Sequence, residues 1–145
     1  MKINFKLFFI LVGLTVIFSS CRTSAPRLDY QALARASVLL GIDINLEDDH
    51  KLYLEAADWI GAPYRGGGDS KRGTDCSGMV YQIYRKVYRI QVPRNTEELK
   101  NKSNKVAKRN LKEGDLVFFS SNRSRKRVAH VGIYLKSGKF IHFST

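Results

Sequence analysis

Few side chains in this sequence could carry acid–base or nucleophilic chemistry. The 145 residues include two cysteines and three histidines, and the 13 acidic residues are outnumbered by 25 lysines and arginines. No internal repeat or low-complexity segment is present, which excludes a repeat architecture. Because 43% of the residues are hydrophobic, the composition is that of a globular protein rather than a disordered one. The length fits one compact domain.

The N-terminal apolar segment is too short for a comfortable bilayer span. It runs from Leu7 to Phe18 behind two lysines, and Ser19 and Ser20 separate it from Cys21. This order of basic region, apolar region and small residues is typical of a secretory signal. Residues 1–20 therefore predict an export signal that is removed from the mature chain.

The segment Phe18-Ser19-Ser20-Cys21 also resembles a bacterial lipoprotein signal, although most such signals have Leu three residues before the cysteine. We expect diacylglycerol on Cys21 and an anchored protein, on the outer membrane facing the periplasm. A disulfide between Cys21 and Cys76 is the alternative that an exported chain raises.

The formal net charge of +12 predicts attraction to anionic polymers without specifying which. Nucleic acid is a poor candidate partner for an exported chain. Anionic lipid head groups, or the carboxylates and phosphates of a cell envelope, fit better. The segment from Lys100 to Lys112 concentrates this charge, and it predicts either a solvated surface or a contact with anionic wall or membrane.

The pattern of residues changes from helical to strand-like along the chain. A short tether ends at Pro26, and residues 21–48 are expected to form this tether and a peripheral helix. Helices are predicted over Tyr30–Leu40 with a stop at Gly41, from Asp48 or Asp49 through Ile60, and from a cap at Thr74 or Asp75 through Val87. Strands are predicted over Leu116–Phe119, Val128–Leu135 and Phe140–Phe143, with a turn at Ser137-Gly138. Helices followed by an antiparallel sheet predict an α+β fold.

Cys76 is the candidate nucleophile. It would lie in the first turn of the third helix, where free backbone N–H groups and the positive end of the dipole stabilise a thiolate. Gly73 and Gly78 keep bulk away from it, and the same N–H groups could receive an oxyanion. A buried, inert cysteine is the alternative.

Two of the three histidines lie in predicted strands. His50 precedes a helix in a polar stretch and is interpreted as a surface residue. His130 interrupts an apolar strand, where a buried ring needs a partner, and it is the candidate base. His142, between Ile141 and Phe143, could accept the Nδ1 proton of the base and orient it. A zinc site of Cys76, His130 and His142 is the rival, but closely spaced ligand pairs are lacking, and no metal or cofactor is predicted.

Six motifs in order resemble the NlpC/P60 family of cell-wall peptidases. They are Gly61-Ala62-Pro63-Tyr64 with Gly66-Gly67, Asp75-Cys76-Ser77-Gly78, Pro93-Arg94, Gly114-Asp115-Leu116-Val117-Phe118-Phe119, Ala129-His130-Val131-Gly132-Ile133-Tyr134, and Phe140-Ile141-His142. Arg65 and Phe143 depart from the family's usual residues. The resemblance implies a papain-like catalytic domain over residues 49–145, and the chain is similar to Spr-type murein endopeptidases.

In the resemblance, Cys76 is the nucleophile, and His130 and His142 complete the catalytic set. It implies that Tyr64 holds the substrate or the oxyanion, and that Asp75 and Ser77 contact a free amino end of the substrate. The implied partner is the stem peptide of peptidoglycan, cut without a cofactor by a monomer. The family continues with further strand where this chain stops, so a truncated domain is expected. The alternatives are a catalytically silent wall-binding lipoprotein and a lipid amidase or acyltransferase.

The register of the two predicted strands tests whether His130 and His142 can act together with Cys76. A two-residue loop at Ser137-Gly138 would place His142 opposite Ile133, on the face away from His130. Catalysis therefore predicts an odd-numbered loop or a bulge.

Overall fold

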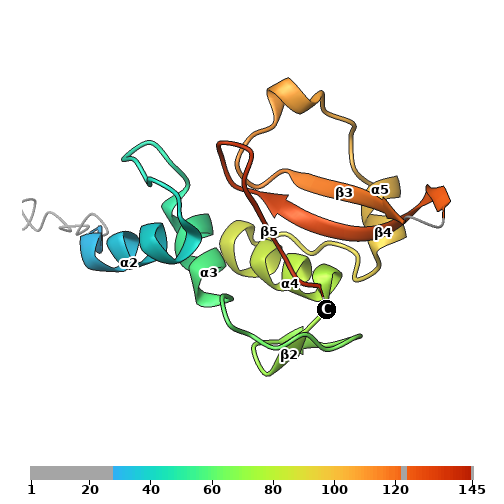
Figure 1. The fold of residues 1–145 in the computed structure, drawn as a ribbon, viewed down its shortest axis with the longest axis horizontal. Coiled ribbons are helices and arrows are strands. Elements are labelled where there is room, and N and C mark those ends of the chain that lie inside the picture. The colour runs from blue at the N-terminus through green and yellow to red at the C-terminus, as the bar shows by residue number, and fades with distance from the viewer. Residues whose placement is uncertain (1–27, 122–123, 145) are drawn as a thin grey trace, which may run out of the picture.

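The computed structural model describes residues 28–121 and 124–144 of the chain (Figure 1). The predicted signal, Cys21 and the tether to Pro26 lie outside these residues. The helical elements are α2 (Tyr30–Leu40), α3 (His50–Asp58), α4 (Cys76–Ile83), the π-helix η1 (Tyr84–Tyr88), α5 (Thr96–Asn101) and the 3₁₀-helix η2 (Lys108–Asn110). The strands are β1 (Asp69–Ser70), β2 (Gly73–Thr74), β3 (Leu116–Ser121), β4 (Ser124–Tyr134) and β5 (Phe140–His142). None of the helices within the described ranges is long and apolar enough to cross a membrane.

The three predicted helices are confirmed, because each begins at an aspartate that caps it. The Asp29 carboxylate accepts a hydrogen bond from the N–H of Ala32, and that of Asp49 accepts one from Leu52. Gly41 ends α2 with a φ of 62°, a left-handed conformation that favours glycine. The second helix ends at Asp58, slightly earlier than predicted, and turns follow it.

The main sheet is an antiparallel meander in the order β3-β4-β5, and α4 packs against β4 (Figure 1). The inner face of the sheet contributes Val131, Ile133 and Ile141 to the core. Residues of α3 and α4 complete this core: Leu52, Tyr53, Ala56, Met79, Val80 and Ile83. The predicted α+β class is confirmed, with one apolar core between helices and sheet.

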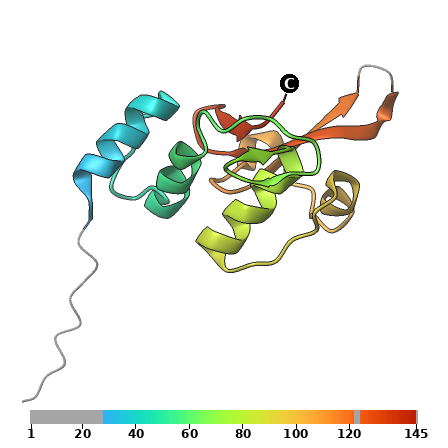
Figure 2. The ribbon, with the colours of Figure 1, turned by 90° about the horizontal axis from the view of Figure 1, so that it is seen from below.

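The helix α2 lies at the far end of the molecule from the sheet (Figures 1 and 2). It packs on α3, and its buried residues are Leu33 and Ala36. This is the peripheral helix that the sequence predicts, since it covers α3 without entering the core between α4 and the sheet.

Two tyrosines of η1 connect this helix to neighbouring segments by hydrogen bonds. The Tyr84 hydroxyl donates to the Gly114 carbonyl over 2.5 Å, and the Tyr88 hydroxyl donates to Asp49 Oδ2 over 2.9 Å. Burial, and to a lesser extent the charge of Asp115, raises the pKa of Tyr84 to about 12. Both tyrosines are therefore neutral donors: Tyr84 holds the Gly114-Asp115 motif in a structural role, and Tyr88 holds the residue that caps α3.

The small hairpin of β1 and β2, and the helices α5 and η2, were not predicted. Each strand of the hairpin has two residues, paired as Asp69 with Thr74 and Ser70 with Gly73. Such short elements contain no repeat of apolar residues that a sequence pattern could reveal. The hairpin matters for the site because it leads directly into α4.

Candidate active site

Cys76 is the first residue of α4, as predicted. Asp75 caps the helix, because its Oδ1 accepts a hydrogen bond of 2.8 Å from the N–H of Gly78. The side chain of Cys76 is half-buried and packs against the apolar core. The alternative of a disulfide between Cys21 and Cys76 stays a prediction, because Cys21 lies outside the described residues.

An ionic network surrounds the cap of α4. Arg94 Nη1 donates to Asp75 Oδ1 over 2.8 Å and to Ser77 Oγ over 2.7 Å. A second guanidinium nitrogen donates to the Gly68 carbonyl, and the N–H of Gly67 donates to Asp75 Oδ2 over 2.7 Å. Arg94 thus joins the glycine loop, which consists of residues 66–68, to the first turn of α4.

The charge state of Asp75 follows from this network. Burial by itself would raise the pKa of the carboxyl, but hydrogen bonds from Arg94, Gly78 and Gly67, with the charge of Arg94, outweigh it. The pKa of Asp75 is therefore held below its ordinary value. The aspartate stays ionised at neutral pH and keeps its cap.

Asp75 and Ser77 are both engaged inside the protein. The Ser77 hydroxyl donates to Asp75 Oδ1 over 3.2 Å, and its side chain is buried. Their predicted contact with a substrate stays a prediction. Sequence reasoning missed the bracing role of Arg94, although the Pro93-Arg94 motif was its signal.

Gly78 makes the closest backbone approach in this region. A Cβ atom at this position would lie 2.2 Å from the Gly68 carbonyl oxygen and 2.7 Å from Thr74 Oγ1. Only a residue without a side chain lets the glycine loop lie against α4. Gly78 in the Asp-Cys-Ser-Gly motif is thus required by packing.

The strand register brings the two histidines together. Gly132 pairs with His142, and the N–H of Leu135 donates to the Lys139 carbonyl, so the loop consists of residues 136–138. Within it, Ser137 and Gly138 have φ values of 54° and 77°. This three-residue loop confirms the predicted odd-numbered connection. Because side chains alternate along a strand, His142 shares the face of His130.

His130 Nε2 lies 2.8 Å from His142 Nδ1, and the rings meet edge to face. The expectation that Nδ1 of the base would be held by the third residue is wrong, because the diagonal placement of the rings across the strands directs Nε2 of His130 toward His142. Nδ1 of His130 is the nitrogen left for another partner.

The surroundings of His130 favour the neutral ring. Burial, and then the charge of His142, lowers the pKa of His130 below its ordinary value. The ring centroid of Phe119 lies 6.1 Å from that of His130, and the rings of Phe119 and Phe140 lie 5.0 Å apart at a tilt beside the histidine pair. A neutral imidazole can accept a proton, which a general base must do.

The thiol of Cys76 has Thr96, the first residue of α5, as its neighbour. Sγ lies 3.8 Å from Thr96 Oγ1, and in the described part of the chain no hydrogen bond joins Sγ to either imidazole. The core that Cys76 contacts includes Val131 of β4 and Ile141 of β5. The first turn of α4 lies beside the end of β5 (Figure 1). Sequence patterns gave no sign of Thr96.

Tyr64 lies beside the entry to α4. It forms an isolated parallel bridge with Thr74, and 44% of its surface is exposed. Its role in holding a substrate or an oxyanion stays a prediction. His50 lies outside the site, where its Nε2 pairs with the Asn45 carbonyl.

The rival zinc site is not formed by the residues that the structure describes. No three side chains of His, Cys, Asp or Glu come together there in a way that could hold a metal ion. The histidine pair is thus short of the further ligand that a tetrahedral site needs.

Comparison with known proteins identifies the class of this fold. A model described as "NlpC/P60 family" matches residues 61–145. The NlpC/P60 domain of the peptidoglycan hydrolase SagA superposes with a TM-score of 0.56 at 31% identity, over 68% of this chain and 80% of that one. The chain belongs to the NlpC/P60 family, and its α+β fold is similar to that of a solved NlpC/P60 domain.

Two curated relatives are named as endopeptidases. A "Probable endopeptidase NlpC homolog" of Haemophilus influenzae is 32% identical over 97% of this chain and 85% of its own length. The "Murein DD-endopeptidase MepS/Murein LD-carboxypeptidase" of Escherichia coli K12 is 38% identical over 70% of this chain. This chain spans about half of the second relative, at 52% of its length.

Proposed function

We propose that this protein is a cysteine endopeptidase that hydrolyses peptide bonds in peptidoglycan stem peptides or cross-links during cell-wall remodelling. The observation that carries the proposal is the pairing of His130 with His142 on adjacent strands, of which β4 packs against the helix that Cys76 begins. A nucleophile, a base and a residue that orients the base are the groups that acyl transfer to a thiol requires.

In the proposed reaction, Cys76 attacks the carbonyl carbon of the scissile peptide bond. Its thiol proton passes to Nδ1 of His130, the nitrogen that His142 does not engage, and the sulfur exchanges Thr96 for this partner. Free N–H groups in the first turn of α4 stabilise the negative oxygen of the tetrahedral intermediate.

The intermediate then collapses to a thioester. The carbon–nitrogen bond breaks, and the amine leaves with the proton from His130. Water attacks the thioester, gives one proton to His130, and releases the carboxylic acid as the thiol is restored. The neutral state of His130 in the resting protein suits both proton transfers.

His142 acts in this proposal as a positioning residue. It fixes the plane of the His130 ring through the bond to Nε2. Tyr64, with its exposed ring near the start of α4, is the proposed contact for the substrate or the oxyanion. Asp75 and Ser77 are proposed to contact the amino end of the substrate. Since Arg94 already bonds to both side chains, this contact would use those parts of the two residues that Arg94 does not engage.

Digestion of purified peptidoglycan tests the activity. The wild-type chain should release soluble fragments that mass spectrometry identifies by the bond cut, while Cys76→Ala should release none. Lys51→Ala, an exposed change on α3, serves as the control that keeps full activity. Fragments released at the wild-type rate by Cys76→Ala would refute the proposal.

A silent wall-binding lipoprotein is the second candidate. The observation in its favour is that Cys76 Sγ pairs with Thr96 rather than with an imidazole. Co-sedimentation with insoluble peptidoglycan separates the candidates, because a silent wall-binding protein would co-sediment with the peptidoglycan and release no soluble fragments.

We also propose export, removal of residues 1–20, and lipidation of Cys21 with anchoring to the outer membrane on its periplasmic side. We expect the mature protein to be a monomer. Mass spectrometry of its N-terminal peptide checks the modification, and an unmodified Cys21 would refute the anchor. Gel filtration in a neutral detergent checks the monomer.

A further inference from the structure

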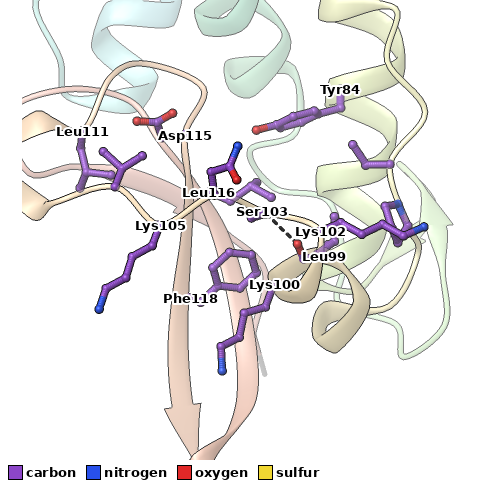
Figure 3. A pocket seen from close by; sticks show the side chains of 14 residues that line it. Tyr84, Leu99, Lys100, Lys102, Ser103, Lys105, Leu111, Asp115, Leu116 and Phe118 are labelled. Carbon is purple, nitrogen blue, oxygen red and sulfur yellow. Dashed lines mark hydrogen bonds between the residues drawn. The ribbon is translucent and has the colours of Figure 1, made fainter.

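A pocket of about 770 Å³ lies between α5, the segment after it, and β3 (Figure 3). This volume is typical of sites for small ligands. The pocket extends away from the candidate active site. Tyr84, which lines it, follows Cys76 by eight residues, which at about 1.5 Å per residue is roughly 12 Å along the helix. Its nearer wall is Leu99, one turn of α5 after Thr96, the neighbour of the thiol.

The bed of the pocket is apolar. Leu116 and Phe118 of β3 face it from one side, since alternate residues of a strand point the same way. Leu99 of α5 forms part of the opposite wall, where the Ser103 hydroxyl donates to the Leu99 carbonyl (Figure 3). Val106 lies at the pocket with 43% of its surface exposed. A ligand with an apolar chain would cover these side chains and gain from their burial.

The charged groups of the pocket are separated by sign. Lys100 and Lys105 extend on either side of Phe118 toward one end, while Asp115 lies at the other end near Tyr84 (Figure 3). Asp115 is already engaged, since its Oδ2 accepts a hydrogen bond of 2.7 Å from the N–H of Lys112.

The lysine end carries unbalanced positive charge. Lys100, Lys102 and Lys105 are exposed, and within the described ranges none of them forms an ion pair with a carboxylate. The sequence from residue 100 to residue 112 holds six basic residues and no acidic one. This end therefore attracts a compact anion such as a phosphate.

We propose that this pocket binds an anionic phospholipid, with an acyl chain on the apolar bed and the phosphate between Lys100 and Lys105. A hydrophilic anionic polymer would satisfy the lysines and leave Leu116, Phe118 and Val106 uncovered. Only an amphipathic anion matches both halves of the pocket. This inference stands on the pocket alone and does not depend on the proposed peptidase activity.

Hydrogen exchange of the full chain tests the proposal. The chain is bound through its own N-terminal segment to vesicles of phosphatidylcholine, or of phosphatidylcholine mixed with phosphatidylglycerol. Exchange over residues 99–106 and 116–118 should slow on the mixed vesicles alone. Even one lysine near an anionic surface contributes about fivefold to binding, so the slowing should reach at least about fivefold.

Two triple variants separate the pocket from the overall charge. Lys100→Gln/Lys102→Gln/Lys105→Gln should abolish the slowing. Arg35→Gln/Lys51→Gln/Arg72→Gln removes the same charge from exposed sites elsewhere and should retain it. Equal loss in both variants would overturn the proposal, because the field of the whole protein would then suffice.

The apolar half needs its own variant. Val106→Asp places a charge at the exposed side of the pocket without disturbing the core, and it should also abolish the slowing. Unchanged exchange in α4 confirms that each variant is folded. Equal slowing on pure phosphatidylcholine, or by soluble peptidoglycan fragments without vesicles, would overturn the assignment to an anionic lipid.

Discussion

His130 Nε2 and His142 Nδ1 lie 2.8 Å apart, in a pair that residues on two adjacent strands form across a three-residue loop. Because the pair engages Nε2, it leaves Nδ1 as the nitrogen of His130 that can accept a proton from a thiol. It also fixes the shared face of the two rings, on which the proposed reaction depends.

Replacement of His142 tests the positioning role. His142→Ala leaves Nε2 of His130 without a partner, and kcat/KM on peptidoglycan fragments should fall about 100-fold. His142→Asn offers an amide oxygen that can replace the ring nitrogen, so part of the loss should be restored. The side chain is exposed, so thermal unfolding of both variants should match the wild type. Full activity in His142→Ala would exclude the role.

The pH dependence of activity should follow His130. Its pKa is lowered by burial and by the charge of His142, so the base stays neutral and active below the ordinary histidine pKa of about 6.5. Phe119→Ala exposes the ring and should raise this pKa, which moves the acid limb of the kcat/KM profile to higher pH. A wild-type acid limb above the ordinary histidine pKa would contradict the assignment.

The same shift affects stability. The unfolded chain binds a proton at the ordinary histidine pKa, whereas folded His130 binds one only at lower pH. The contribution of His130 is therefore intact above the unfolded pKa and is lost as pH falls through the folded pKa. Urea unfolding measured as pH falls from the unfolded to the folded pKa of His130 should show a smaller loss in the free energy of unfolding for His130→Gln than for the wild type.

Arg94 should matter for stability through Asp75. Arg94→Gln removes the charged donor from Asp75 Oδ1 and from Ser77, at a cost of about 2 kcal/mol in the free energy of unfolding at pH 7. The pKa of Asp75 is lowered, so its stabilising contribution exists above the unfolded value of about 3.9 and disappears as pH falls through the folded one.

The difference in the free energy of unfolding between wild type and Arg94→Gln should thus be smaller in acid than at pH 7. Urea unfolding at pH 7 and at a pH below the folded pKa of Asp75 measures it. Arg72→Gln, on the exposed turn of the small hairpin, is the control and should stay within about 0.5 kcal/mol of the wild type. A pH-independent difference would mean that Arg94 acts by packing rather than by its bond to an ionised Asp75.

Gly78→Ala should destabilise the protein by about 3 kcal/mol, because the new Cβ would meet the Gly68 carbonyl at 2.2 Å. Gly66→Ala is a matched control in the glycine loop that lies against α4, since a Cβ there meets nothing within 4 Å, and it should change stability by less than about 0.5 kcal/mol. Chemical unfolding of both variants checks the contrast. Equal stabilities would show that the glycine loop can move away from α4.

Sequence by itself determined the elements whose cause is local. Asp49 and Asp75 cap helices within three residues of their own positions, and Gly41 ends one by its conformation. These interactions are short in sequence, so the pattern of residues predicted Gly41 and left only two neighbouring candidates for each of the two caps. The same pattern predicted that Cys76 would begin a helix.

Only the tertiary structure decided the contacts between distant segments. Arg94 reaches Asp75 and Gly68, Thr96 meets Cys76, and the pocket joins α5 to β3, because packing of the core places these segments side by side. The sequence predicted that a histidine pair required an odd-numbered loop. Only the folded register could choose that loop and direct Nε2 of His130, rather than Nδ1, toward His142, since backbone pairing sets the facing of side chains.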